Sequence, residues 1–340
     1  MSKRVLVLYT GGTIGMVPSE QGYVPQAGFE ARLRQHLNDP RLPDFDLIEF
    51  EQPLDSASLV PEDWTRIGQL LQQHWDAYAG FVVLHGTDTL AYTASALSFM
   101  LAQQDKPVVL TGSQIPLSQL RNDAADNLVT ALLLAAHPGL AEVCVCFNGR
   151  ILRGNRSRKV NSTGLDAFDS PNYPHLGRAG IDLELKERLL LPAESARFEL
   201  APCCSGAVAM LGLFPGIQAD MLRRFCAEPG LRGLVLITYG VGNPPASDPA
   251  LLQVLADAIA QGLTVVNLSQ CHQGAVSQGA YATGALLNDI GVLAGADLTP
   301  EAAFAKLHHL VARHAEAARV REGMQSAQRG ECRLAQESSA

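Results

Sequence analysis

Short apolar runs alternate with helical patterns along the first half of the chain, and this alternation constrains the fold more than any other feature. The runs cover residues 4–9, 46–50, 81–84, 107–110 and 143–147. Helical patterns cover residues 89–101 and 123–136, and another begins at Pro61 with two acidic residues in its first turn. Strands that alternate with helices indicate parallel β-α-β units. We therefore expect an α/β fold whose larger N-terminal domain has a mostly parallel sheet flanked by helices.

The pattern loosens after Lys159 and resumes as a second, smaller α/β unit. This unit is predicted to contain strands at 233–238 and 264–268, a helix at 249–261, and a final helix that Thr299 caps with Pro300 at its first position. The sequence thus predicts an N-terminal domain at 1–188, a linker at 189–208 and a smaller C-terminal α/β domain at 209–340.

Charge and apolar content disfavour several classes of partner. The net charge of -8 argues against a nucleic-acid surface, although the locally basic stretch 152–159 would suit one small anionic ligand. No apolar stretch approaches the ~18 residues of a membrane-spanning helix. The first apolar run is also too short for a signal peptide. We expect a cytoplasmic protein that binds neither nucleic acid nor membrane.

The cysteine pattern disfavours a disulfide framework or a zinc site. The chain has seven cysteines, and no two of them have the C-x-x-C spacing. Cys144 and Cys146 lie two residues apart in an apolar run, so we expect them to share one face of the sheet as core residues.

Small polar residues and glycines follow four consecutive predicted strands. These segments are TGGTIG at 10–15, HGTDT at 85–89, TGSQ at 111–114, and NGR at 148–150 with RGNR at 153–156. Ligands of open parallel sheets bind at the carboxyl ends of the strands. The four segments therefore predict a polar crevice in which the backbone can approach a small ligand.

The first of these loops does not match either nucleotide-binding template. In the dinucleotide fingerprint G-x-G-x-x-G, the first glycine would fall on Thr10. A phosphate-binding loop requires a lysine after its last glycine, and none follows Gly15. Taken alone, this loop is most simply a tight turn that caps a helix.

The second loop adds residues that could activate a hydroxyl. A threonine is a weak nucleophile until a base takes its proton, and Thr87 is followed by the carboxylate of Asp88. Lys159 could serve as that base while Asp88 holds it, with backbone N–H groups of Gly12, Thr13 and Thr87 facing an oxyanion. The alternative is structural: Thr87 and Asp88 could cap the next helix, and Lys159 could be one solvated charge among arginines. The residues alone leave both interpretations open.

Together the two loops resemble a known family. TGGTIGM at 10–16 and HGTDT at 85–89 are similar to the two threonine signatures of bacterial-type L-asparaginases. Further segments resemble the type I, cytoplasmic branch of that family, and they lie at 21–23, 61–64, 91–100, 111–116, 154–156, 239–243 and 281–284. The resemblance extends over nearly the whole chain.

The resemblance implies hydrolysis of L-asparagine to L-aspartate and ammonia, without a metal or a cofactor. It identifies Thr13 as the nucleophile and Tyr23 as a residue that assists it from the following loop. Thr87, Asp88 and Lys159 would form the second catalytic group.

The same resemblance implies how the substrate is held. Asp88 would also contact the α-ammonium group, and Ser56, with Asp55 beside it, the α-carboxylate. The Gly12 backbone and the Ser113 carbonyl would face the amide. Members of the family are homodimers or dimers of dimers. Asn243 is the candidate contribution from a partner chain.

The chain also departs from the family pattern. Some type I members bind an effector asparagine, and Cys271 matches a residue of that pocket. Arg158 and Thr238 stand where an effector-binding threonine and arginine are expected, so we do not expect cooperative activation by asparagine. The segment 161–164, beside Lys159, differs as well.

Two other functions remain open from the sequence. One is a glutaminase or the amidase subunit of a tRNA-dependent amidotransferase, although the negative net charge disfavours tRNA. The other is a non-catalytic amino-acid sensor on the same scaffold.

Overall fold

The chain divides into two compact units, Met1–Leu200 and Ala201–Ala340. The computed structural model describes residues 4–20, 22–26, 28–245 and 247–333, so Gln21 of the quoted segment 21–23 lies outside the described residues. The division falls within 189–208, and the domain bounds given above stay a prediction. None of the described helices is long and apolar enough to span a bilayer.

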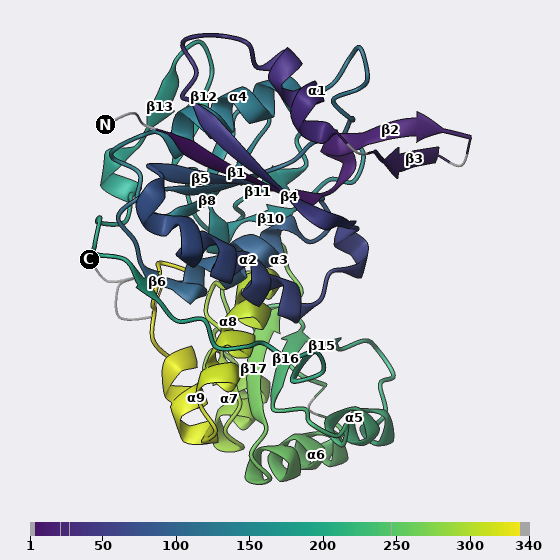
Figure 1. Cartoon of the computed structure of the whole chain (residues 1–340). Coiled ribbons are helices and arrows are strands. Elements are labelled where there is room, and N and C mark those ends of the chain that lie inside the picture. Colours follow the sequence, from purple (N-terminus) through teal and green to yellow (C-terminus); the bar gives the residue numbers. More distant parts are fainter. Residues whose placement is uncertain (1–3, 21, 27, 246, 334–340) are drawn as a thin grey trace. The chain divides into compact units, whose positions relative to one another are not determined.

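An eight-stranded sheet forms the centre of the larger unit, in the order β13-β12-β9-β8-β7-β5-β1-β4 (Figure 1). In chain order these strands are β1 Val5–Gly11, β4 Phe45–Leu54, β5 Gly80–Leu84, β7 Val108–Thr111, β8 Val143–Phe147, β9 Arg150–Arg153, β12 Gly177–Ala179 and β13 Leu183–Leu185. Neighbours from β4 to β8 are parallel, and from β8 to β13 antiparallel. The predicted fold class, a mostly parallel sheet flanked by helices, is confirmed.

Helices cover both faces of this sheet. They are α1 Phe29–His36, α2 Pro61–His74, α3 Leu90–Met100 and α4 Ala124–Ala135. Figure 1 shows α1 and α4 on one face and α2 and α3 on the other. In α2, Pro61 starts the helix, the Asp63 carboxylate accepts a hydrogen bond from the Val60 N–H at 3.0 Å, and Trp64 and Ile67 are buried.

The core beneath α1 and α4 contains alternate residues of the strands. Val5 and Val7 of β1 join Phe29 and Leu128 of the helices in one cluster. Cys144 and Cys146 belong to the same cluster, which confirms that they share one face of the sheet.

Shorter elements connect these layers. They are the hairpin of β2 Met16–Ser19 and β3 Gly22–Pro25, the pair β10 Arg158–Lys159 and β11 Phe168–Asp169, the pair β6 Leu101–Gln103 and β14 Arg197–Phe198, and the 3-10 turns η1 Thr13–Gly15, η2 Ser56–Ser58, η3 Trp75–Ala77, η4 Gly154–Arg156 and η5 Glu187–Leu189. The predicted connecting segment therefore contains β14, which pairs with the strand that follows α3.

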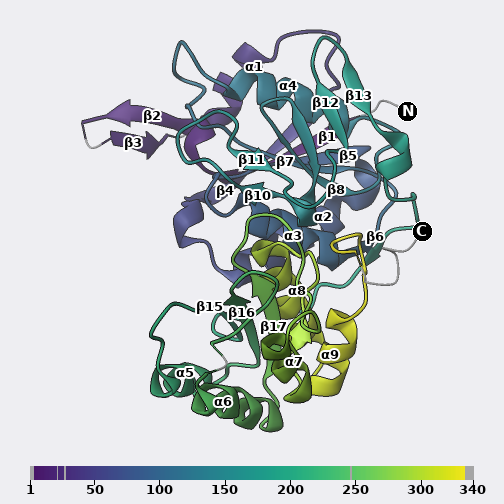
Figure 2. The ribbon, with the colours of Figure 1, turned by 180° about the vertical axis from the view of Figure 1, so that it is seen from behind.

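The smaller unit is built on a parallel sheet in the order β15-β16-β17-β18 (Figure 2). Its elements are β15 Val208–Gly212, α5 Ala219–Cys226, β16 Gly233–Thr238, α6 Pro249–Ala260, β17 Thr264–Ser269, α7 Ala282–Asp289, β18 Leu293–Ala294, α8 Pro300–Arg313 and α9 Ala317–Met324. The Thr299 hydroxyl accepts from the Ala302 N–H at 3.1 Å, so the predicted cap is confirmed. The expectation that this helix is the last is wrong, because α9 follows it.

Candidate active site

The carboxyl ends of β4, β1, β5, β7 and β8 lie along one edge of the large sheet, because these strands are neighbours and parallel. Three of the four predicted polar segments follow β1, β5 and β7 at this edge, and Asn148 and Gly149 follow β8. Ser56 lies in η2, directly after β4, and so joins the same edge.

The segment 153–156 does not belong to this edge, and that expectation is wrong. β9 runs antiparallel to β8, so Arg153 pairs with Cys144 near the start of β8. A Cβ on Gly154 would lie 3.0 Å from the Val143 carbonyl oxygen. The turn after β8 reverses the chain and carries the arginines to the opposite edge.

Two of the four cations in the basic stretch 152–159 are buried. Arg153 is buried, with its Nε 2.7 Å from Glu142 Oε2. Arg156 is buried as well, with its guanidinium 5.1 Å from the centre of the Tyr173 ring. These two arginines are packed into the fold, so Arg158 and Lys159 are the partly exposed cations of this stretch.

Two glycines allow the strand-end loops to touch through their backbones. Gly12 has a φ of 92°, and a Cβ there would lie 2.5 Å from the Gly86 Cα. A Cβ on Gly86 would lie 2.3 Å from the Ser56 Oγ. The loops that carry Thr13, Thr87 and Ser56 are therefore in direct contact.

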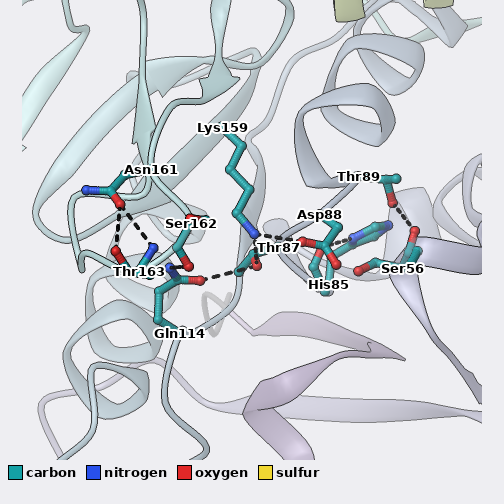
Figure 3. Close-up of polar contacts among 12 residues, drawn as sticks. Ser56, His85, Thr87, Asp88, Thr89, Gln114, Lys159, Asn161, Ser162 and Thr163 are labelled. Atoms are coloured by element: carbon teal, nitrogen blue, oxygen red, sulfur yellow. Dashed lines mark hydrogen bonds and ion pairs between the residues drawn. The ribbon is translucent and has the colours of Figure 1, made fainter.

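Lys159 makes polar contacts with the other two residues of the predicted second catalytic group (Figure 3). Its Nζ lies 2.8 Å from Thr87 Oγ1 and 2.7 Å from Asp88 Oδ1. Thr87 is buried, the Lys159 side chain is 20% exposed and the Asp88 side chain is 59% exposed. The structure therefore brings together an ammonium, a hydroxyl and a carboxylate, with the carboxylate open to solvent.

The structural alternatives for these residues are wrong. The N-cap residue of α3 is Thr89, not Thr87 or Asp88, and its hydroxyl donates to the Ser56 carbonyl at 2.8 Å. Lys159 is mostly buried and paired, so it is not a solvated charge.

Gln114 is a residue of this cluster that the sequence did not single out. Its Oε1 accepts from Thr87 Oγ1 at 3.3 Å, and its backbone N–H donates to Asp123 Oδ2 at 2.9 Å. Asp123 was expected only to begin a helix, but its carboxylate also accepts from the Ile115 N–H at 2.9 Å. An acidic residue before a helix usually caps that helix, so the sequence offered no signal for this contact.

The other two predicted catalytic residues belong to the loop after β1 and to the hairpin that follows it. Thr13 is half-buried in η1, Tyr23 is 50% exposed in β3, and no hydrogen bond of the described residues links either of them to Thr87, Asp88 or Lys159.

The residues expected to hold the substrate are placed as follows. Ser56 and Ser113 are buried, and exposed Asp55 accepts from the Ala57 N–H at 3.1 Å. Asn243 belongs to the smaller unit, where its Oδ1 accepts from the Thr283 hydroxyl at 3.1 Å. No three His, Cys, Asp or Glu side chains converge as metal ligands in the described part of the chain.

His85 supports the second loop as a neutral side chain. Its Nδ1 lies 2.8 Å from the Gly86 carbonyl oxygen, and its Nε2 lies 2.9 Å from Thr93 Oγ1. Burial lowers the pKa of His85 from 6.5 to about 4. In the neutral ring, Nδ1–H donates to the carbonyl and Nε2 accepts from the Thr93 hydroxyl.

We expect folding stability to fall by about 2 kcal/mol between pH 7.5 and pH 5 through His85. The pKa of His85 is about 4 in the folded chain and near 6.5 when the chain unfolds, so the unfolded state binds more protons in this window. Urea unfolding of the wild type and of His85→Gln at both pH values measures the difference. Equal pH slopes for the two proteins would contradict this interpretation.

Comparisons with known proteins find a family match in each of the two units. The family described as "Asparaginase, N-terminal" matches residues 4–191, and the family "Glutaminase/Asparaginase C-terminal domain" matches residues 207–324. The chain is 45% identical to L-asparaginase 1 of Escherichia coli K12, over 97% of this chain and 98% of that one.

Solved structures of two relatives are similar over nearly their whole length. L-asparaginase I of Vibrio cholerae has a TM-score of 0.91 and 43% identity, and 98% of this chain and 100% of that one are covered. The thermostable L-asparaginase of Thermococcus kodakarensis has a TM-score of 0.87 and 33% identity, with 97% and 99% covered.

Proposed function

The chain belongs to the asparaginase family, and from that premise we propose that it hydrolyses the side-chain amide of L-asparagine to L-aspartate and ammonia. The observation that carries the proposal is the contact of Lys159 with both Thr87 and Asp88 at the strand-end edge. An amidase needs a base within hydrogen-bonding distance of a hydroxyl or a water, and this cluster supplies one.

We assign the nucleophile to Thr13. Its hydroxyl oxygen attacks the side-chain amide carbon, the C–N bond breaks, and the nitrogen leaves as ammonia with the hydroxyl proton. Water then attacks the ester carbon and the bond to Thr13 Oγ1 breaks. The proton of that water passes by way of Thr87 and Lys159 to Thr13 Oγ1, which restores the hydroxyl and releases L-aspartate. The contact between Gly12 and Gly86 supports this assignment, because it holds the two threonine loops together. Tyr23, on the neighbouring hairpin, assists Thr13.

Asp88 has a second part in this proposal. Its carboxylate is more than half exposed and carries one oxygen beyond the contact with Lys159, so it can accept from the α-ammonium of the substrate. Ser56, with Asp55 beside it, binds the α-carboxylate, while the Gly12 backbone and the Ser113 carbonyl face the amide. Backbone N–H groups of Thr13 and Thr87 stabilise the oxyanion.

We further propose a cytoplasmic homo-oligomer, either a dimer or a dimer of dimers. Asn243 of one protomer would contribute to the site of another. Within its own unit this residue closes a turn by pairing with Tyr239, which fixes the loop that presents it.

An ammonia-release assay on the purified chain tests the function. We expect release from L-asparagine along a hyperbolic curve, because Thr238 is fully buried and its Oγ1 is committed to Asn267 Oδ1 at 2.7 Å. A sigmoidal curve would contradict our interpretation of Arg158 and Thr238. No release from asparagine or glutamine would favour the amino-acid sensor, and a clear preference for glutamine would favour the glutaminase alternative.

A further inference from the structure

The segment just after Lys159 folds into a turn that a single side chain holds. Asn161 Oδ1 accepts from the Thr163 N–H at 3.0 Å and from the Gly164 N–H at 2.9 Å (Figure 3). Its contact with the Thr163 hydroxyl is longer, at 3.4 Å. Asn side chains form such turns by substituting for a backbone carbonyl.

The turn presents two carbonyl groups to Gln114. Gln114 Nε2 donates to the Ser162 oxygen at 3.3 Å and to the Gly164 oxygen at 3.1 Å. Only the NH₂ side of an amide can bind carbonyl oxygens, so Oε1 must face the other way. That oxygen lies 3.3 Å from Thr87 Oγ1.

The direction of the Gln114 amide decides how the Thr87 hydroxyl is used. Thr87 has one proton, and Gln114 Oε1 accepts it. An oxygen lone pair of Thr87 is then left to accept from Lys159 Nζ at 2.8 Å. If the turn opened, the Gln114 amide could rotate, and the Thr87 hydroxyl would lose this orientation.

The backbone of Gln114 does not depend on the turn. Asp123, itself buried, accepts from the Gln114 and Ile115 N–H groups. Opening the turn would therefore leave the strand-end loop in place and change only the side-chain amide. Because the backbone and the side chain of Gln114 are held by different groups, the effect of the turn on the side-chain amide can be tested by itself.

We propose that Asn161 and Gln114 are positioning residues: the turn that Asn161 holds orients the Gln114 amide, which accepts the Thr87 proton and so keeps an oxygen lone pair of Thr87 directed at Lys159 Nζ. The expected effect of these residues on catalysis rests on the proposed function. Neither residue contacts the substrate in this mechanism.

The first test compares Asn161→Ala with Asn161→Asp. The alanine variant loses both turn contacts, and we expect its kcat for asparagine to fall about 10- to 100-fold with little change in KM, because catalytic groups lose alignment. The aspartate variant keeps an acceptor oxygen for both N–H groups and should retain the wild-type kcat. Thr163→Ala loses only the 3.4 Å contact and serves as the matched control.

A second measurement does not depend on turnover. Hydrogen exchange at the amides of Thr163 and Gly164 should accelerate in Asn161→Ala, and the rate at which acetic anhydride labels Lys159 should change with it. Unchanged exchange, or faster exchange with unchanged kcat and labelling, would overturn the inference. If the wild type released no ammonia, the proposed function would fail by itself, and the labelling rate would still decide the inference.

Discussion

Lys159→Met is expected to lower kcat for asparagine by about 1000-fold, within the range that a positioned base contributes. Methionine has similar length but no proton to exchange, so Thr87 and Asp88 would lose the group that lies within 2.8 Å of both. The substitution also leaves the Asp88 carboxylate without its cation. Steady-state ammonia release over a range of asparagine concentrations separates kcat from KM.

Two further variants make this result interpretable. Lys186 is exposed and lies outside the cluster, so Lys186→Met should keep the wild-type kcat. Thr13→Ala removes the proposed nucleophile and should be at least as damaging as Lys159→Met. Near-wild-type turnover by Lys159→Met would show that the cluster of Thr87, Asp88 and Lys159 is structural.

The second large effect concerns stability, in the smaller unit. Lys306 of α8 and Glu331 are fully buried, with Nζ and Oε1 2.7 Å apart. Although burial opposes its charged form, Lys306 and the N–H groups of Gln328 and Arg329 hold the pKa of Glu331 below its usual value. Lys306→Met would leave a buried carboxylate without its cation, and we expect the free energy of unfolding to fall by about 3–5 kcal/mol.

Urea unfolding of the full chain measures this loss. Glu322→Gln removes one partner of an exposed pair with Arg319, so it should change stability by less than about 1 kcal/mol. Replacing both partners, in Lys306→Met/Glu331→Leu, should restore much of the stability because no charge is left unpaired. A small effect of Lys306→Met alone would show that water or another group compensates the carboxylate.

Elements with strong apolar runs were predicted well from the sequence. The run at 143–147 coincides with β8, and that at 233–238 coincides with β16, because buried parallel strands are continuously apolar. The sequence also predicted that the polar segments after β1, β5 and β7 lie together, because neighbouring parallel strands end at the same edge of a sheet.

The sequence analysis did not predict that β9 runs antiparallel to β8, although the sequence contains a signal for this reversal of the chain. Asn148 and Gly149 have φ values of 47° and 70°, and Asn-Gly between two strands is typical of a hairpin turn. The contacts of Gln114 were beyond sequence reasoning, because Ser162 and Gly164 lie far along the chain and contribute only their backbone carbonyls. Every residue has a backbone carbonyl, so the sequence does not show which carbonyls will accept a hydrogen bond from a distant side chain.

The contact between Gly12 and Gly86 has a consequence for protein engineering. Where two backbones meet without side chains between them, the spacing of the loops cannot be adjusted by exchanging one residue for a larger one. Attempts to broaden the substrate range are better directed at side chains next to this backbone contact, such as Ser56, than at the glycines themselves. Variants with altered selectivity would therefore have to keep Gly12 and Gly86 unchanged.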